Sequence, residues 1–195
     1  MVKVKHFYHS ESSTLSYVVH HTKTKDCIII DPVLNYDYAS STINKNSINE
    51  ISSYIKNNQL NPHYILETHV HADHLTGSQV LKEFFPNIKI AISKKILEVR
   101  VLFRELFNIN LEIANEPFDK LLEDDDTFCA GDISIKSIST PGHTPACMSF
   151  LIDKNVFTGD CIMMPDFGTG RCDFPGGSAK ETFNSIVNKL YKLPE

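Results

Sequence analysis

Alternating hydrophobic and polar residues predict several short strands along the chain. Residues 2–8 (VKVKHFY) and 15–21 (LSYVVHH) alternate with the period of a strand that buries one face. Residues 27–33 (CIIIDPV) form a continuous apolar run, which predicts a buried strand that stops at Pro32. Similar runs predict further strands at residues 63–68, 88–92, 133–140, 146–152 and 155–159, with a hairpin turn at residues 153–155.

Apolar residues at spacings of three and four predict helices between these strands. An amphipathic helix is expected at about residues 48–58, where Ser47 and Glu50 match the pattern of a capping box. A second helix follows the strand at 63–68 and carries the apolar residues Val80, Leu81, Phe84 and Phe85. Two more helices are expected to open at Ser93 and after Ser178.

Composition narrows the class of protein. With 42% hydrophobic and 22% charged residues, the 195-residue chain is expected to form one soluble globular α/β domain over residues 1–195. The acidic stretch at residues 115–128 predicts a solvated loop. A formal net charge of −5 leaves no basic stripe for a nucleic acid or an anionic membrane, so a small-molecule partner is expected.

The chain also lacks the signals of export. No apolar run approaches the roughly 20 residues of a membrane span, and the first ten residues lack the apolar stretch of a signal peptide. The five cysteines are scattered and form no CxxC pair, so we expect reduced thiols and a cytoplasmic protein.

The densest chemistry lies in THVHADH, residues 68–74. Alternate residues of an extended segment project to one side, so His69, His71 and Asp73 are expected to converge, with His74 beside them on the following turn. Crowded imidazoles and carboxylates in a buried turn are unfavourable unless a cation organises them. The cluster therefore predicts a metal site.

Two later loop residues extend this candidate donor set. His143 lies in STPGHTPA and Asp160 lies in FTGDC, each at the end of a predicted strand. A dispersed set of nitrogen and oxygen donors suits zinc, iron or manganese better than a thiolate site.

Together, HVHADH, TPGHT and FTGD occur in an order and at separations that resemble the metallo-β-lactamase superfamily over essentially the whole chain. The resemblance implies an αββα sandwich, in which two mixed β-sheets lie face to face with helices outside. It also implies that metal binds at one edge, where the loops converge.

A narrower resemblance comes from MPDFGTGRCDFPGG at residues 164–177, combined with DPV at 31–33 and VRVLFRELFNIN at 99–110. These segments resemble the persulfide dioxygenases, the ethylmalonic encephalopathy protein family, and its bacterial branch of β-lactamase-like hydrolases. That resemblance implies one Fe(II) per chain, held by the catalytic residues His69, His143 and Asp160, with zinc as the alternative metal. The implied reaction is oxidation of a glutathione-type persulfide by O2 to sulfite and free thiol.

The remaining motif residues have two open roles each. His71, Asp73 and His74 match residues that build a second metal site in hydrolase relatives, whereas in a dioxygenase they would orient the ligands and bound water. Arg171 is expected either to contact an anionic substrate or to brace the loop through Asp173.

The chain departs from the family pattern at its end, KLYKLPE, because no histidine follows Asp160. We therefore expect an apparently C-terminally truncated fold that lacks one ligand of a binuclear site. Two alternatives to the dioxygenase are a zinc-dependent thioester hydrolase resembling glyoxalase II and an inactive metal-binding fragment. The thiol that carries the persulfide, a homodimeric assembly, and a role in sulfide detoxification or sulfur assimilation are left open.

Overall fold

A computed structural model describes residues 1–109 and 117–194. Residue 110 of the stretch at 99–110, and residues 115–116 of the acidic stretch, lie outside the described residues. Contacts divide the chain into two compact units built from interleaved segments. Unit 1 contains residues 1–67, 71–91 and 129–134, and unit 2 contains the described residues of 68–70, 92–128 and 135–195. The expectation of one domain over the whole chain stays a prediction.

A mixed sheet begins in unit 1. Its strand order is β1-β2-β3-β6-β8-β9, with antiparallel β1/β2 and β2/β3 pairs and parallel β3/β6 and β6/β8 pairs. The parallel strands carry apolar runs such as Ile28–Ile30, which are fully buried, as expected for strands covered on both faces. The strands are β1 (Val2–His9), β2 (Thr14–His21), β3 (Asp26–Ile30), β6 (Asn61–Leu66), β8 (Lys89–Ser93) and β9 (Lys120–Leu122).

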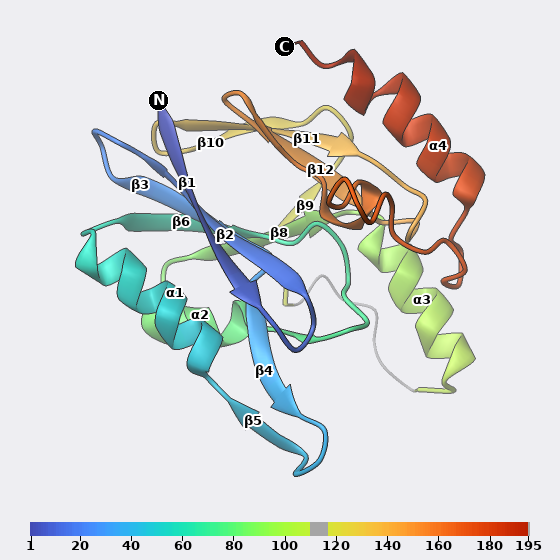
Figure 1. The fold of residues 1–195 in the computed structure, drawn as a ribbon, viewed down its shortest axis with the longest axis horizontal. Coiled ribbons are helices and arrows are strands. Elements are labelled where there is room, and N and C mark those ends of the chain that lie inside the picture. Colours follow the sequence, from blue (N-terminus) through green and yellow to red (C-terminus); the bar gives the residue numbers. More distant parts are fainter. Residues whose placement is uncertain (110–116, 195) are drawn as a thin grey trace. The chain divides into compact units, whose positions relative to one another are not determined.

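Two helices and a small sheet complete unit 1. Helix α1 (Asn46–Asn57) packs beside α2 (Ser78–Phe84) and against β1 and β4 (Figure 1), and it buries Ile48, Ile51 and Ile55. The small sheet has the order β5-β4-β7 and consists of β4 (Val33–Asp37), β5 (Thr42–Asn44) and β7 (Leu75–Thr76).

The capping box predicted at Ser47 is wrong. Helix α1 begins at Asn46, and its N-cap is Lys45, which makes no side-chain cap hydrogen bond. The amide of Ser47 instead donates to Oδ1 of Asn35, 2.9 Å away on β4. A side chain distant in sequence therefore takes over the role of the local cap.

A second sheet has the order β10-β11-β12-β13, and its β11/β12 and β12/β13 pairs are antiparallel. The predicted hairpin turn is confirmed, because β12 and β13 pair across Asp153, which has a φ of 55°. The strands are β10 (Thr127–Ala130), β11 (Ile133–Ser139), β12 (Met148–Ile152) and β13 (Asn155–Phe157).

The helices of unit 2 frame its core. Helix α3 (Ile96–Leu106) buries Ile96 and Val99 in a cluster with Ile92 and Ala146. Helix α4 (Ala179–Asn188) packs near the short 3₁₀ helices η1 (Gly159–Cys161) and η2 (Leu190–Lys192) (Figure 1).

Three predictions in unit 2 met different outcomes. The helix expected after Ser178, where Ser178 and Glu181 match the pattern of a capping box, is confirmed, since the Ser178 hydroxyl caps α4 by accepting from the amide of Glu181 at 3.3 Å. Helix opening at Ser93 is wrong, because Ser93 ends β8 and Lys95 is the N-cap of α3. The acidic stretch is also more ordered than a loop, since it contains β9 and the first residues of β10.

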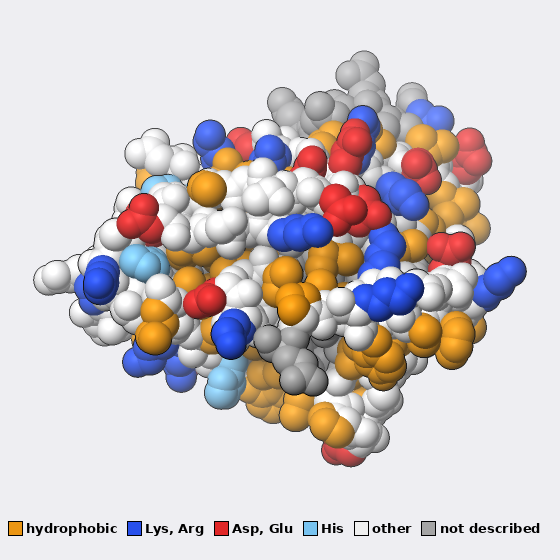
Figure 2. Space-filling view, turned by 90° about the horizontal axis from the view of Figure 1, so that it is seen from above, with side chains coloured by type: hydrophobic (Ala, Val, Ile, Leu, Met, Phe, Trp, Pro, Cys, Tyr) orange, Lys and Arg blue, Asp and Glu red, His pale blue; other side chains and the backbone are white. Residues whose placement is uncertain are grey.

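The predicted α/β class is confirmed by this arrangement of strands and helices. All five cysteines are free thiols, also as predicted. No helix among residues 1–109 and 117–194 is long and apolar enough to cross a bilayer. Figure 2 shows acidic and basic side chains interspersed on one face of the molecule.

Candidate metal centre

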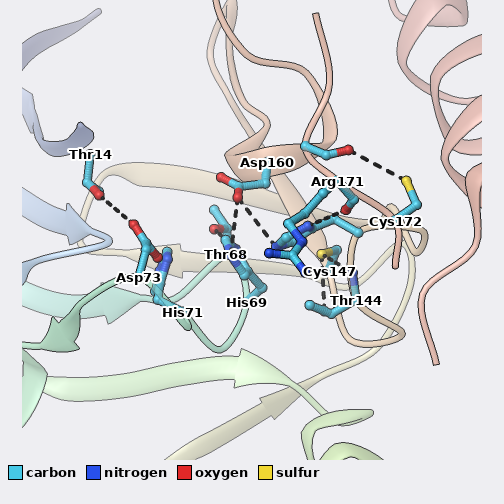
Figure 3. Close-up of polar contacts among 12 residues, drawn as sticks. Thr14, Thr68, His69, His71, Asp73, Thr144, Cys147, Asp160, Arg171 and Cys172 are labelled. Carbon is cyan, nitrogen blue, oxygen red and sulfur yellow. Dashed lines mark hydrogen bonds and ion pairs between the residues drawn. The ribbon is translucent and has the colours of Figure 1, made fainter. Parts of the chain in front are cut away.

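Unit 2 brings together His69, His143 and Asp160, which we call the triad. Their ligand atoms all lie within 4.8 Å of one another. Oδ2 of Asp160 is 3.4 Å from Nε2 of His143 and 3.8 Å from Nε2 of His69. Figure 3 shows the labelled His69 beneath the Asp160 carboxylate, and the two distances place both imidazole Nε2 atoms beside the same oxygen. This convergence is the geometry that a shared cation requires.

The loop around Thr68 positions His69. The carbonyl of Thr68 accepts from the amide of Met148 at the start of β12, at 2.8 Å. The Thr68 hydroxyl lies 3.0 Å from Nδ1 of His69, so the other ring nitrogen, Nε2, faces Asp160. The imidazole is buried, with 2% of the residue exposed, which excludes bulk water from this donor.

A backbone carbonyl fixes the orientation of His143. Nδ1 of His143 lies 2.6 Å from the carbonyl oxygen of Arg171. A carbonyl oxygen only accepts, so Nδ1 carries the proton and Nε2 of the neutral ring presents a lone pair towards Asp160. Gly142 permits this turn: its φ is +150°, and a Cβ there would lie 2.0 Å from Oγ1 of Thr182.

Asp160 is held by close approach of the glycine-rich loop. The amide of Gly170 donates to the Asp160 carbonyl at 2.7 Å. A Cβ on Gly170 would lie 2.7 Å from that carbonyl oxygen and 3.2 Å from Nδ1 of His143. Phe174 lies further along the loop. Its ring centroid is 6.0 Å from that of His143 and 5.4 Å from that of Phe103 on α3, and the ring planes are tilted relative to one another. The loop thus contacts two of the three triad residues.

Arg171 and Asp173 form a bidentate pair on this loop. Nε and Nη2 of Arg171 donate to the two carboxylate oxygens at 2.6 and 3.0 Å. These hydrogen bonds raise the pKa of Arg171 and lower that of Asp173. The Arg171 side chain remains 71% exposed, so it forms the predicted brace and still faces solvent.

Unit 1 brings together His71, Asp73 and His74, whose ligand atoms also lie within 4.8 Å of one another. Burial raises the pKa of Asp73, but hydrogen bonding to His74 outweighs it and lowers that pKa to about 2. Nε2 of His74 is buried and has no hydrogen-bond partner among the described residues. The sequence analysis expected His69, His71 and Asp73 to converge on one site. In the structure they fall into two groups: His69 lies with His143 and Asp160, and His71 lies with Asp73 and His74.

Two buried carboxylates beside His71 were missed by the sequence analysis. Nε2 of His71 is 3.3 Å from Oδ1 of Asp31 and 3.6 Å from Oε2 of Glu67. Glu67 also accepts very short hydrogen bonds from the hydroxyls of Thr76 and Ser78. Burial lowers the pKa of His71, but the two carboxylates outweigh it and raise that pKa well above its ordinary value. The position of Asp31 at a strand end, in DPV, was the available signal.

The donors of both groups fit a divalent cation. The triad offers two imidazole Nε2 atoms and a carboxylate, with each histidine Nδ1 engaged elsewhere. Such outer hydrogen bonds are the usual companions of metal-ligating histidines. In unit 1, the buried Nε2 of His74 lacks a protein partner among the described residues, a costly state that a cation would relieve.

Comparisons with known proteins agree with the motifs. The family model described as the metallo-beta-lactamase superfamily matches residues 10–194. The chain is 43% identical to "Glyoxylase B2" of Dictyostelium discoideum, over 99% of this chain and 67% of that protein. It is 27% identical to "Persulfide dioxygenase ETHE1, mitochondrial" of Homo sapiens, over 99% of this chain and 65% of that protein.

A solved structure is similar to this chain over nearly its whole length. The crystal structure of ETHE1 from Myxococcus xanthus matches with a TM-score of 0.77 and 26% sequence identity. The match covers 99% of this chain and 72% of that one. This chain thus spans about two thirds of these relatives, and less than half of the "Beta-lactamase hydrolase-like protein" of Xylella fastidiosa, of which it covers 44%.

Proposed function

The chain belongs to the metallo-β-lactamase superfamily, and from this premise we propose that it is a metal-dependent enzyme that oxidises a glutathione-type persulfide with O2. The proposed metal is one Fe(II) per chain, held by His69, His143 and Asp160. The products are sulfite and the free thiol. One persulfide, one O2 and one water balance one thiol and one sulfite, with release of protons.

The observation that carries this proposal is the composition and geometry of the triad. Two imidazoles and one carboxylate are the donor set typical of non-haem Fe(II) oxygenases. The Arg171 carbonyl holds His143 in the tautomer that offers Nε2, and both histidine Nε2 atoms face Asp160. A ferrous ion bound there would supply the redox chemistry by which O2 reacts with a sulfur substrate.

The surroundings of His71 support a mononuclear site. Its Nε2 is engaged by Asp31 and Glu67 within unit 1. On this proposal the contact holds the segment that follows Glu67, although the ligand atoms of Asp31, Glu67 and His71 also lie within 4.8 Å of one another, close enough to share a cation. The similarity to a protein named as a persulfide dioxygenase points to the same chemistry.

The loop at residues 164–177 supplies the candidate substrate contacts. Asp173 holds the Arg171 guanidinium in a fixed orientation, and the cation remains exposed to an anionic substrate such as a glutathione derivative. The ring of Phe174 lies beside that of His143, which is itself buried. The formal net charge of −5 argues against a polyanion as the partner.

Replacing His143 by alanine tests this function. Without the Nε2 donor we expect O2 uptake with glutathione persulfide to fall at least about 100-fold, together with the bound iron. His21→Gln is the matched control, because His21 lies on β2, outside both candidate metal groups, and its Nδ1 bonds to Thr24. Undiminished sulfite production by His143→Ala would contradict the assignment.

A second candidate function is a zinc-dependent thioester hydrolase. Two observations favour it: the grouping of His71, Asp73 and His74, and the 43% identity to a protein named Glyoxylase B2. Zinc-loaded protein that hydrolyses a glutathione thioester, and takes up no O2 with persulfide, would establish this function in place of the dioxygenase.

A further inference from the structure

The start of α4 lies against both chain segments that meet at the His143 ring. One segment is the turn that carries His143. The other is the loop at residues 164–177, whose Arg171 carbonyl accepts from Nδ1 of that ring at 2.6 Å. Thr182, near the start of α4, contacts both segments. It is buried and had no role in the sequence analysis.

The first contact of Thr182 is with Gly142, the residue before His143. A Cβ on Gly142 would lie 2.0 Å from Oγ1 of Thr182 and 2.5 Å from its amide nitrogen, so the backbone of the turn packs directly on the helix. The amide of Ser178 donates to the Gly142 carbonyl at 2.7 Å. The turn that carries His143 is therefore held directly against α4.

The second contact is with Cys172, the residue after Arg171. Sγ of Cys172 lies 3.1 Å from Oγ1 of Thr182 and 3.5 Å from the Gly170 carbonyl oxygen (Figure 3). A thiol has one proton, so it donates to one of these oxygens at a time. When it donates to the carbonyl, the hydroxyl of Thr182 donates to the sulfur. The contact between sulfur and hydroxyl is present in both arrangements.

The hydroxyl of Thr182 is itself held in place. Its Oγ1 lies 3.3 Å from the Ser178 carbonyl oxygen, one helical turn earlier, and the Thr182 amide donates to the same carbonyl at 3.0 Å. A helical threonine has two common χ1 rotamers, because its Oγ1 bonds to the preceding turn in one of them. This bond selects the rotamer that presents the oxygen to Cys172.

The Arg171 carbonyl belongs to the planar peptide that joins Arg171 to Cys172. On one side of this peptide, the Gly170 amide donates to the Asp160 carbonyl at 2.7 Å. On the other side, the Cys172 sulfur meets the hydroxyl on α4 at 3.1 Å. Attachments on both sides of one peptide plane set the direction of its oxygen, which is the oxygen that binds Nδ1 of His143.

We propose that Thr182 and Cys172 are positioning residues, whose contact locks the loop at residues 164–177 onto α4 and keeps the Arg171 carbonyl on Nδ1 of His143. The ring is thereby kept in the tautomer that offers Nε2 to Asp160. The inference rests on the proposed function only for the use of His143 as a metal ligand. It gives a role to two side chains outside the triad.

Other contacts of the loop act at different places. The ion pair between Arg171 and Asp173 lies within the loop and is exposed on both sides, so it ties the loop to no other element. The Phe174 ring packs against α3, two residues beyond Cys172. The contact between Cys172 and Thr182 acts at the residue that directly follows the Arg171 carbonyl.

Nuclear magnetic resonance of the metal-free protein tests the positioning without any reaction. At a pH where His143 is neutral, its ring ¹⁵N shifts should report protonation on Nδ1 in the wild type. Thr182→Val keeps the shape of the side chain against Gly142 and removes the hydroxyl, so it should convert His143 to a mixture of tautomers. Thr182→Ser keeps the hydroxyl and should retain the wild-type tautomer. An unchanged tautomer in Thr182→Val would overturn the proposal.

A Zn²⁺ titration followed by the same ring shifts measures the consequence for metal binding. We expect Thr182→Val and Cys172→Ala each to weaken Zn²⁺ binding at His143 by about 10-fold, the lower end of the effect of outer hydrogen bonds on metal sites. Cys172→Ser keeps a donor and should stay within about 3-fold of wild type. Two matched controls are Cys129→Ala, an exposed thiol on β10, and Ser52→Ala, whose hydroxyl donates to a backbone carbonyl of α1.

The double variant Thr182→Val/Cys172→Ala separates a shared contact from two independent packing effects. If the two side chains act through their contact, the double variant should bind Zn²⁺ within about 3-fold of either single variant. Independent effects would multiply to a loss of about 100-fold, and that result would overturn the proposal. Thermal unfolding of each metal-free variant shows whether it is folded before its zinc affinity is compared.

Separate outcomes bear on the proposed function. A wild-type His143 whose ring shifts ignore Zn²⁺ would contradict the triad as a metal site, whereas the tautomers of the metal-free variants would still test the contact between Thr182 and Cys172. Tautomers and zinc affinities that follow the expected pattern, without O2 uptake by the iron-loaded protein, would contradict the proposed function and support the contact.

Discussion

At the scale of single residues, the chemistry of each candidate ligand depends on what its other atoms contact. His143 offers Nε2 because the Arg171 carbonyl accepts from Nδ1 at 2.6 Å. Gly170 makes this possible, because only a residue without a side chain lets the loop approach Asp160 so closely. The loop therefore contributes its backbone to the triad, while its charged side chains remain exposed.

Gly170→Ala tests this close approach. A Cβ 2.7 Å from the Asp160 carbonyl must displace the loop, so we expect iron affinity to fall by at least about 10-fold. Gly168→Ala, in the same loop, is the control. Its φ of +78° makes alanine strained there, but a Cβ would meet nothing within 4 Å. Equal iron affinity in the two variants would contradict the role of Gly170.

At the scale of elements, α4 secures the loop that carries His143. The Ser178 amide donates to the Gly142 carbonyl at 2.7 Å, and the Ser185 hydroxyl donates to the Pro141 carbonyl at 2.8 Å. At the other end of the helix, Nζ of Lys189 bridges Oδ2 of Asp124 and the carbonyl of Ser139, at 2.6 and 2.8 Å.

Ser178→Ala removes the confirmed cap of α4. Loss of an N-cap serine costs about 1 kcal/mol in the free energy of unfolding, or roughly 2–4 °C in melting temperature for a chain of this size. Ser53→Ala, on α1, is a comparison within a helix interior. An unchanged melting temperature for Ser178→Ala would show that the cap contributes nothing measurable.

Asp124→Asn tests the contact at the end of α4 through its pH dependence. Burial raises the pKa of Asp124, but hydrogen bonds from Lys189 and the Ser139 amide outweigh it and lower the pKa below 3.8. The stabilisation is therefore present above that ordinary value and is lost as pH falls through the lowered pKa of the folded state. Because the pair is partly exposed and screened by solvent, we expect about 0.5–1 kcal/mol in urea unfolding at neutral pH. A difference from wild type that persisted undiminished in strong acid would contradict this account.

Local sequence patterns predicted where helices and strands occur better than they predicted the residues at which these begin and end. The 3.6-residue periodicity of Ile48, Ile51 and Ile55 located α1. Residues that bury one face of a helix are close together in sequence, so a local pattern reveals them. Its start was misplaced because Asn35, which binds the first turn, lies on another strand. The triad residues were predicted from their motifs, whereas Asp31 and Glu67 were missed because their proximity to His71 is created by tertiary contacts.

At the scale of the whole molecule, each candidate metal group lies within one compact unit. His69, His143 and Asp160 belong to unit 2, and His71, Asp73 and His74 belong to unit 1. The chain crosses between the units on either side of residues 68–70, so HVHADH contributes to both. The number of metal ions bound per chain therefore separates the two candidate functions.

The central claim is a single redox-active iron in the triad. It is tested most directly by metal analysis of anaerobically purified protein, followed in the same sample by O2 uptake with glutathione persulfide. The account predicts about one iron per chain, with O2 uptake matched by sulfite production. Two zinc ions per chain, no O2 uptake and hydrolysis of a glutathione thioester would contradict it.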